Sequence, residues 1–351
     1  MKTMVIGFGQ CGGRLADEFV RLDLRARDFR GINVITRTIA VDTDMNSMQG
    51  LSPNRPGNLK ILIGEGKTRG HGVAKQRELA AQIAMEEDFK ITNEIKDSGR
   101  LDSTDAFMVV GGAAGGTASG GLPVFARTLK EKYNRPVFGL VVLPFEHELE
   151  IEANFTKNTA QCLQEIRSIA DAVFIFDNQR YIQKGLSWRE NISEINKMIV
   201  EPFFNLLCAG EEKKSEHVGV STLEINDILQ MLTGWAAIGY GKVDLPIIPM
   251  PWDKKGDAAH HGTTAMEAAL SDLSVQCDPA KATKALYLVS APENQIGIGL
   301  VTQLGEFIRK ISPEASIRYG DYPIDKALVD VTVVLSGLRE IESVMAYQNP
   351  I

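Results

Sequence analysis

Cysteine is scarce in this sequence, and no CxxC spacing occurs among Cys11, Cys162, Cys208 and Cys277. This pattern argues against a disulfide framework and a zinc site, and it favours the reducing cytoplasm. Long apolar runs are also missing, because no stretch approaches the roughly 18 to 20 residues that a membrane-spanning helix needs. The opening MKTMVIGFGQ reaches a glycine turn too early for a signal peptide. We therefore expect a soluble, cytoplasmic protein without a transmembrane segment.

An excess of positive charge is missing too. The 38 Lys and Arg residues are outnumbered by 45 Asp and Glu residues, which gives a net charge of −7. The charges are spread without long runs of one sign, and no basic patch with interleaved aromatic residues is visible. We expect no nucleic-acid partner. What is present is an ordinary globular composition, 44% hydrophobic over 351 residues, which favours two domains.

Short apolar runs alternate with longer helical patterns in the first half of the chain. The runs predict strands at 4–8, 38–42, 59–64, 106–112, 136–144 and 171–178, and the patterns predict helices at 12–24, 73–97, 119–133 and 152–170. The third helix is expected to open at Ser119, a good N-cap residue. Both the odd and the even positions of these strands are apolar, as in a parallel sheet that helices cover on both faces. This order predicts a doubly wound α/β nucleotide-binding domain over 1–186.

The second half has a different rhythm. Residues 187–210 are interpreted as a connecting helix, in which Pro202 is expected to start a new segment or a kink. Beyond it, helices are predicted at 262–272 and 297–311, and strands at 284–292 and 328–338. So few crossover units predict a smaller α+β domain over 211–351.

Glycine is concentrated in VVGGAAGGTASGGLPVFARTL, residues 109–129, between an apolar run and an amphipathic one. A strand, a glycine-rich turn and a helix N-terminus form an anion site, because unpaired N–H groups and the positive end of the helix dipole converge there. Glycine removes the Cβ atoms that would keep a phosphate away. We interpret the segment as a phosphate cradle, with Thr117 and Ser119 as further donors. The alternative, a flexible linker, fits poorly with the apolar segments on both sides.

A second glycine turn, GFGQCGG at 7–13, fits the GxGxxG fingerprint of dinucleotide-binding proteins. Taken alone it predicts an NAD(P)-dependent oxidoreductase. The fingerprint expects a ribose-binding acid about 20 positions further on, whereas Asp42 follows Gly13 by 29 residues. Two cradles for one ligand instead suggest a triphosphate that is held from two sides.

Together, the two turns make the sequence resemble the tubulin/FtsZ superfamily of filament-forming GTPases. GGAAGGTASGG resembles the phosphate loop of that superfamily, and GFGQCGG resembles its first nucleotide loop. The opening MVIGFGQCGG, the double-alanine phosphate loop and the compact C-terminus are most similar to the archaeal CetZ group. The resemblance covers nearly the whole chain. It implies a cytoskeletal GTPase that binds GTP and GDP, assembles with itself head to tail into protofilaments, and serves cell shape or division.

The resemblance also implies a set of nucleotide contacts. They are Gly9, Gln10, Cys11 and Gly12 in the first loop, Asp42, the N–H groups of Gly70, His71 and Gly72 at the γ-phosphate, Gly112, Ala113, Ala114, Gly115, Gly116, Thr117 and Ala118 in the phosphate loop, Glu148 at the ribose, and Asn178 and Asn196 at the guanine edge. A carboxylate accepts from two vicinal hydroxyls, and an amide offers both a donor and an acceptor to a base. Mg²⁺ would bridge phosphate oxygens with mostly water ligands, with Gln10 as its candidate protein contact.

Hydrolysis is expected to depend on a neighbouring subunit. In the superfamily, the catalytic carboxylates come from the second domain of the next subunit, and TLEIND places Glu224 and Asp227 at the matching positions. Residues three apart lie on one face of a helix, where a carboxylate can orient the attacking water. On the residues alone, an acidic helix start that is stabilised by the dipole is the favoured explanation of the pair.

Several positions depart from the superfamily pattern. Ala114 and Ala118 replace glycines of the phosphate loop, which leaves open a scaffold that binds nucleotide and assembles without useful hydrolysis. Glu224 is longer than the usual aspartate, so the division of labour with Asp227 is open. Glu152 stands where FtsZ has an arginine, and that contact is not carried over. The chain shows neither tubulin's terminal helical hairpin nor FtsZ's peptide for a membrane adaptor, so we expect no direct docking of those partners.

Overall fold

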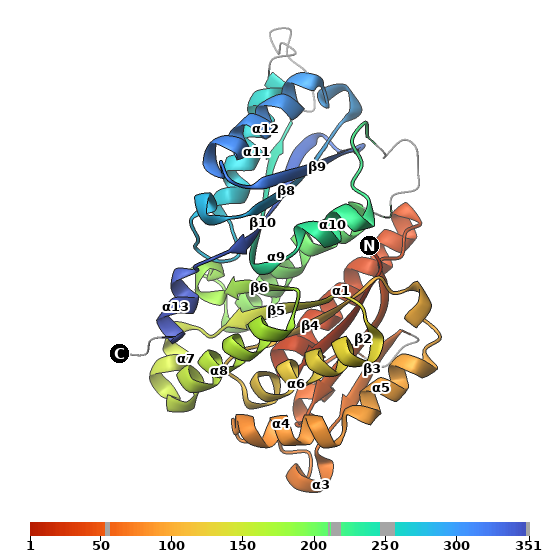
Figure 1. Cartoon of the computed structure of the whole chain (residues 1–351), viewed down its shortest axis with the longest axis vertical. Helices are drawn as coiled ribbons and strands as arrows, with labels where there is room; N and C mark the ends of the chain where they lie inside the picture. Colours follow the sequence, from red (N-terminus) through yellow and green to blue (C-terminus); the bar gives the residue numbers. More distant parts are fainter. Residues whose placement is uncertain (53–56, 210, 212–218, 246–256, 349–351) are drawn as a thin grey trace. The chain divides into compact units, whose positions relative to one another are not determined.

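The computed structural model describes residues 1–52, 57–209, 211, 219–245 and 257–348. The chain divides into two compact units (Figure 1). The larger unit comprises Lys2–Phe204 and Glu342–Ile351, and the smaller unit comprises Met1 and Asn205–Ile341. Each unit is described separately. None of the described helices is long and apolar enough to cross a membrane.

The larger unit is built on a parallel sheet with the strand order β3-β2-β1-β4-β5-β6. Its strands are β1 (Thr3–Phe8), β2 (Ile35–Asp42), β3 (Asn58–Leu62), β4 (Ala106–Gly112), β5 (Val137–Leu143) and β6 (Ala172–Asp177). Every residue of β1 and β5 is buried, as expected for strands that are covered on both faces. The strand order reverses beside β1, and such a switch point is where open α/β sheets bind ligands.

Helices connect and cover these strands (Figure 1). They are α1 (Gly9–Arg30), α2 (Met45–Gln49), α3 (Glu65–Thr68), α4 (Arg77–Glu86), α5 (Asp88–Asp97), α6 (Gly116–Tyr133), α7 (Glu146–Ile151), α8 (Ala153–Ile169) and α13 (Glu342–Gln348), with short 3-10 turns at Leu101–Ser103 and Asn178–Tyr181. Helix α1 packs along β1, β2 and β4, whereas α6 lies over β1, β4 and β5 and contacts α4 and α8. The predicted doubly wound sheet is confirmed.

Two helix predictions were wrong in detail, and one short helix was missed. The helix expected at 73–97 is two helices, α4 and α5, that meet at Glu87. Helix α6 begins at Gly116 rather than Ser119, because Gly115 is the N-cap and the Ser119 N–H already donates to its carbonyl at 3.0 Å. The short helix α7 was not predicted.

Helix α9 (Trp188–Ala209) continues through Pro202 instead of starting anew there. An interior proline costs about 3 kcal/mol, since it removes a hydrogen bond and crowds the preceding turn. Ile199, Phe203 and Leu207 are buried on both sides of the proline, and burial of each such side chain contributes roughly 1.5–3 kcal/mol. The packing of these residues outweighs the unfavourable effect of proline inside the helix.

The smaller unit has a mixed sheet in the order β7-β10-β8-β9, antiparallel except for the parallel pair β8 and β9. Its strands are β7 (Gly234–Asp244), β8 (Lys284–Ala291), β9 (Ser316–Pro323) and β10 (Leu328–Leu338), and its helices are α10 (Ile225–Met231), α11 (Asp257–Ser271) and α12 (Ile298–Ile311), with 3-10 turns at Pro279–Lys281 and Glu293–Gln295. The predicted α+β class is confirmed. Strands β7 and β9 were not predicted, and the first half of β9 alternates between exposed and half-exposed residues.

Candidate functional site

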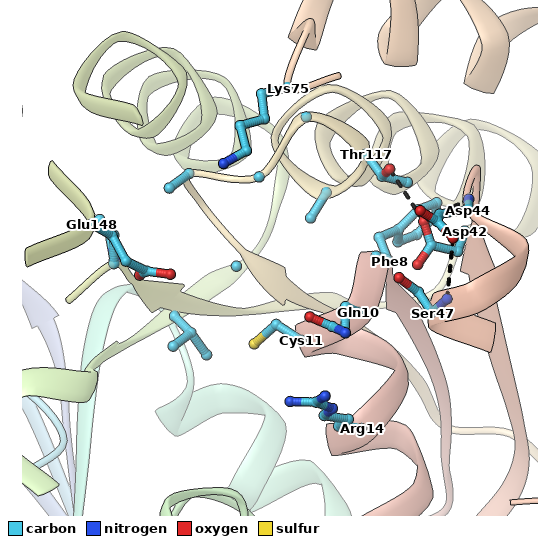
Figure 2. Close-up of a pocket in the computed structure, with 18 of the residues that line it drawn as sticks. Phe8, Gln10, Cys11, Arg14, Asp42, Asp44, Ser47, Lys75, Thr117 and Glu148 are labelled. Atoms are coloured by element: carbon cyan, nitrogen blue, oxygen red, sulfur yellow. Dashed lines mark hydrogen bonds between the residues drawn. The ribbon is translucent and has the colours of Figure 1, made fainter. Parts of the chain in front are cut away.

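A cavity of about 480 Å³ lies in the larger unit, where the first glycine turn meets the turn after β4 (Figure 2). Among the sequence-predicted nucleotide contacts, all but Gly12, Gly70 and Ala113 line it. The cavity therefore gathers segments that are far apart in the chain, including the two glycine turns and residues of α9.

The first glycine turn brings α1 unusually close to the sheet. A Cβ on Gly7 would lie 2.1 Å from the Gly12 carbonyl oxygen, and a Cβ on Gly12 would lie 2.3 Å from the carbonyl oxygen of Val110. Gly12 thus serves helix packing instead of lining the cavity. Gly9 begins the helix with φ of +70°, a conformation that favours glycine, and it lines the cavity.

The glycines after β4 divide into two kinds. A Cβ on Gly115 would meet nothing within 4 Å, and this exposed residue lines the cavity. A Cβ on Gly120 would lie 2.3 Å from the Arg77 carbonyl oxygen, and one on Gly121 would lie 3.1 Å from the Phe8 ring. The interpretation of the whole run as a phosphate cradle was therefore too broad. Gly120 and Gly121 allow α6 to approach α4 and β1.

The start of α6 has the features of an anion site. The first turn of a helix leaves its N–H groups without intrahelical acceptors, and those of Gly116, Thr117 and Ala118 have no acceptor within the described residues. The helix dipole adds positive potential at this end. Ser119 does not contribute, because its hydroxyl is fully buried and donates to the Gly116 carbonyl at 3.3 Å. The expectation of a Ser119 donor was wrong.

Asp42, at the end of β2, connects the loop after β2 to the start of α6. Its Oδ1 accepts from the Thr43 N–H at 2.7 Å and from the Thr117 hydroxyl at 3.3 Å, and the Thr43 and Thr117 hydroxyls lie 2.8 Å apart. Figure 2 shows Asp42 and Thr117 facing each other across this junction. Burial raises the pKa of Asp42 from 3.8 to about 6, against the hydrogen bonds that lower it.

This raised pKa predicts a pH dependence of stability. The folded chain binds a proton at Asp42 more tightly than the unfolded chain does, so ionisation costs stability as the pH rises from about 4 to 6. Asp42→Asn removes that loss. Relative to wild type, the free energy of unfolding of the variant should rise by on the order of 2 to 3 kcal/mol between pH 4 and pH 7. Urea titrations of nucleotide-free protein at several pH values test this, and Asp28→Asn, at an exposed position, is the control. If the difference in free energy of unfolding between wild type and Asp42→Asn does not change with pH, the prediction is wrong.

The loop before α4 binds its own N–H groups within the chain. The N–H of Gly70 donates to the Thr68 hydroxyl at 3.2 Å, that of His71 to the Thr68 carbonyl at 3.1 Å, and that of Gly72 to the Thr43 carbonyl at 3.0 Å. These three N–H groups thus already have acceptors within the chain. His71 and Gly72 line the cavity and Gly70 does not. Contact of these residues with a nucleotide stays a prediction.

Polar and aromatic side chains also line the cavity. One oxygen of Glu148 accepts from the Phe145 N–H at 2.9 Å. The Asn178 Oδ1 is buried and has no hydrogen-bond partner within the described chain. A buried acceptor without a donor costs about 1–3 kcal/mol, so an N–H group that reached this atom would stabilise the site. Asn196 and Trp188, both on α9, line the cavity as well.

Cys11 is an unsuitable nucleophile. It lines the cavity at the start of α1, and burial raises the pKa of its thiol to about 12. The thiol therefore stays protonated at neutral pH. Gln10 is exposed on the first turn of the same helix, and its side chain projects among the drawn cavity residues (Figure 2).

Comparison with known protein families shows which family the chain belongs to. Residues 2–184 match the GTPase domain of the Tubulin/FtsZ family, and residues 185–350 match the C-terminal domain of tubulin-like CetZ proteins. The chain belongs to the tubulin/FtsZ family, in its CetZ group. Tubulin-like protein CetZ1 of Haloferax volcanii is 32% identical, over 99% of this chain and 91% of the relative. CetZ3 of the same organism is 30% identical over 99% of this chain and 91% of the relative.

Solved CetZ structures resemble the whole chain. CetZ1 of Haloferax volcanii, as a GDP-bound monomer, has a TM-score of 0.85 and 30% identity, over 99% of this chain and 98% of that one. CetZ2 of the same organism, as a GTPγS-bound protofilament, has a TM-score of 0.87 and 26% identity, over 99% of this chain and 96% of that one. The sequence-based recognition of the family is confirmed.

The acidic pair expected from the tubulin/FtsZ resemblance lies on the surface of the smaller unit. Glu224 is the exposed N-cap of α10, and its N–H donates to Oδ2 of Asp227 at 3.3 Å. Asp227 is about one-third exposed and lies 3.7 Å from Nε of Arg318. Both carboxylates are thus accessible on one helical turn.

Proposed function

We propose that this CetZ-group chain is a GTPase that assembles head to tail into protofilaments, with hydrolysis completed by the adjoining subunit. The observation that carries the proposal is the cavity itself, whose lining includes both the start of α6, with N–H groups that have no acceptor within the described chain, and Asn178, whose Oδ1 has no hydrogen-bond partner there. An anion site and an amide that needs a donor, both in the lining of one cavity, match a phosphorylated base.

Each part of the nucleotide has a candidate partner. The N–H groups of Gly116, Thr117 and Ala118 would receive phosphate oxygens, and the exposed Gly115 leaves room for their approach. The free oxygen of Glu148 would accept from the ribose hydroxyls. Asn178 and Asn196 would read the guanine edge. That CetZ1 and CetZ2 of Haloferax volcanii were solved with GDP and GTPγS supports guanine as the base.

Magnesium fits this site as a cation shared with the phosphates. Among the described residues, no cluster of three or more His, Cys, Asp or Glu side chains could hold a metal alone. Mg²⁺ typically keeps several waters and takes few protein ligands beside phosphate oxygens. Gln10 would contact it directly or through water. When bound, the ion would neutralise charge on the phosphates.

The acids of the smaller unit would act on a nucleotide that another copy holds. Glu224 and Asp227 are accessible on one turn of α10, and a carboxylate near a terminal phosphate can orient the attacking water. A head-to-tail contact of this kind does not close, so it produces a filament. The GTPγS-bound protofilament of CetZ2 supports such assembly. We place the filament in the cytoplasm, with a role in cell shape or division.

Two other functions compete with this proposal. The NAD(P)-dependent oxidoreductase rested on the first glycine turn, and it loses support because residues 2–184 match the Tubulin/FtsZ GTPase domain. The non-hydrolysing scaffold rested on Ala114 and Ala118. Both alanines are buried in the phosphate loop, and a Cβ on Gly111 would already lie 2.9 Å from that of Ala118. The Ala118 methyl group thus packs beside Gly111, and the N–H groups of Gly116, Thr117 and Ala118 still have no acceptor within the described chain, which favours a usable cradle.

Light scattering and phosphate release separate these functions. With GTP, we expect scattering that rises and then decays as phosphate is released, whereas a non-hydrolysable analogue should give persistent polymers. Equal and persistent polymers without released phosphate would support the scaffold. Binding of NADH, together with no effect of GTP, would support the oxidoreductase.

A further inference from the structure

The loop between α3 and α4 holds two consecutive residues in a conformation that side chains rarely adopt. Ala74 has φ of +44° and Lys75 has φ of +62°. Left-handed backbone is strained at residues other than glycine, and it persists only where the surroundings impose it. Both residues line the cavity.

Buried contacts impose this conformation. The side-chain amide of Asn158, on α8, is buried and donates to the Lys75 carbonyl and to the Ala114 carbonyl, each at 3.0 Å. Gly116, the first residue of α6, lies so close that an added Cβ would be 2.8 Å from the Lys75 Cα. The Lys75 backbone is therefore fixed against the start of the helix that forms the anion site.

The Lys75 side chain is held far more weakly than its backbone. Its Nζ lies 3.8 Å from a carboxylate oxygen of Glu152 and 4.4 Å from the centre of the Phe155 ring. The first distance exceeds that of a hydrogen bond, and the Lys75 side chain is 48% exposed. Ion pairs of this kind contribute little to stability. The ammonium group can leave Glu152 at small cost.

Few cationic side chains line the cavity to balance the negative charge of a bound nucleotide. Among the described residues that line it, the lysine and arginine side chains are those of Lys75 and Arg14. Figure 2 places them on opposite sides of the drawn residues, Arg14 on α1 and Lys75 beside the phosphate loop. Asp42, Asp44 and Glu148 add negative charge to the lining. Of these two cationic side chains, Lys75 would therefore be the one that pairs with a terminal phosphate at the start of α6.

We propose that Lys75 is the residue that distinguishes a nucleoside triphosphate from a diphosphate. Its ammonium group leaves Glu152 for the terminal phosphate when that group is present and returns to Glu152 when only a diphosphate is bound. Glu152 thus competes with the terminal phosphate and lowers the affinity for triphosphate. This inference rests on the proposed binding of guanine nucleotides in the cavity.

Isothermal titration of nucleotide-free protein with GTPγS and with GDP, each with Mg²⁺, tests the inference. Lys75→Gln should weaken GTPγS about tenfold, the loss expected for a hydrogen bond between charged groups, and should change GDP affinity less than twofold. Glu152→Gln should tighten GTPγS severalfold and leave GDP unchanged. Lys157→Gln is the matched control, because this lysine pairs with Glu78 at 3.2 Å and does not line the cavity.

The outcomes are distinguishable. Equal weakening of both nucleotides by Lys75→Gln would mean that the side chain only supports the loop, and unchanged binding of both would mean that it contacts neither; either result overturns the inference. Should Lys75→Gln fail to fold, Glu152→Gln decides alone, and an unchanged GTPγS affinity overturns the inference. Failure of the wild type to bind either nucleotide would instead overturn the proposed function.

Discussion

Replacement of Asp227 by alanine is expected to lower GTP turnover at least 100-fold while GTP binding stays within twofold of wild type. General acid–base assistance contributes typically 10²- to 10⁴-fold, and the proposal assigns that step to this carboxylate. The residue makes no buried contact that binding would need, since it is about one-third exposed and accepts one N–H from Glu224 at 3.3 Å. Filaments should therefore persist, because the nucleotide that promotes assembly is not consumed. Phosphate release, nucleotide titration and sedimentation measure the three properties.

A neighbouring residue on the same helix gives the control for this variant. Asn226 is exposed between the two acids, and Asn226→Ala should keep turnover near the wild-type rate. Glu224→Ala shows how much each carboxylate contributes to hydrolysis. A larger loss of GTP turnover in this variant than in Asp227→Ala would make Glu224 the principal acid. Loss of GTP binding by Asp227→Ala would contradict the assignment to a neighbouring subunit.

Gly115→Ala and Gly120→Ala should fail in opposite ways, although they add the same methyl group to the same glycine run. At Gly115 the methyl group meets nothing within 4 Å, and the φ of −68° and ψ of 150° suit alanine. The melting temperature should barely change, whereas the affinity for GTP should fall at least tenfold, because the methyl group stands where phosphate would approach. At Gly120 it would lie 2.3 Å from the Arg77 carbonyl oxygen, and overpacking of this kind costs roughly 1–3 kcal/mol or more.

Thermal unfolding and GTP titration of both variants check this pair. Gly99 is a control, because it neither lines the cavity nor packs closely against another element. Its φ of +61° makes any side chain strained there. Gly99→Ala should thus cost some stability and leave GTP affinity unchanged. Wild-type GTP affinity for Gly115→Ala would show that this residue does not border the phosphates.

The sheet could be predicted from the sequence because burial on both faces leaves a largely apolar run in its central strands, as in β1 and β5. The start of α6 could not, since the N-cap is Gly115, which carries no side-chain signal, while Ser119 has the appearance of a cap. Likewise, Gly115 and Gly120 look alike in a sequence, yet one faces the cavity and the other faces α4.

The candidate site was predicted in outline because its residues follow strand ends, and the carboxyl ends of parallel strands meet at one edge of the sheet. The bonding of individual groups depends on contacts that are distant in sequence. The N–H of Gly72 donates to the Thr43 carbonyl at 3.0 Å, which no local pattern indicates. Lys75 was missed for the same reason, because its place beside the phosphate loop is set by Asn158 and Gly116.

The central claim, that one subunit holds GTP and the next supplies the acid, is tested most directly by mixing two inactive variants. Asp227→Ala keeps the pocket and lacks the acid, whereas Gly115→Ala keeps the acid and, at a GTP concentration below its dissociation constant, has an empty pocket. Each should release almost no phosphate alone. We predict that the mixture regains phosphate release, since the acid of one variant meets the GTP of the other. A mixture that stays as inactive as its components, while the two variants sediment together, would contradict the account.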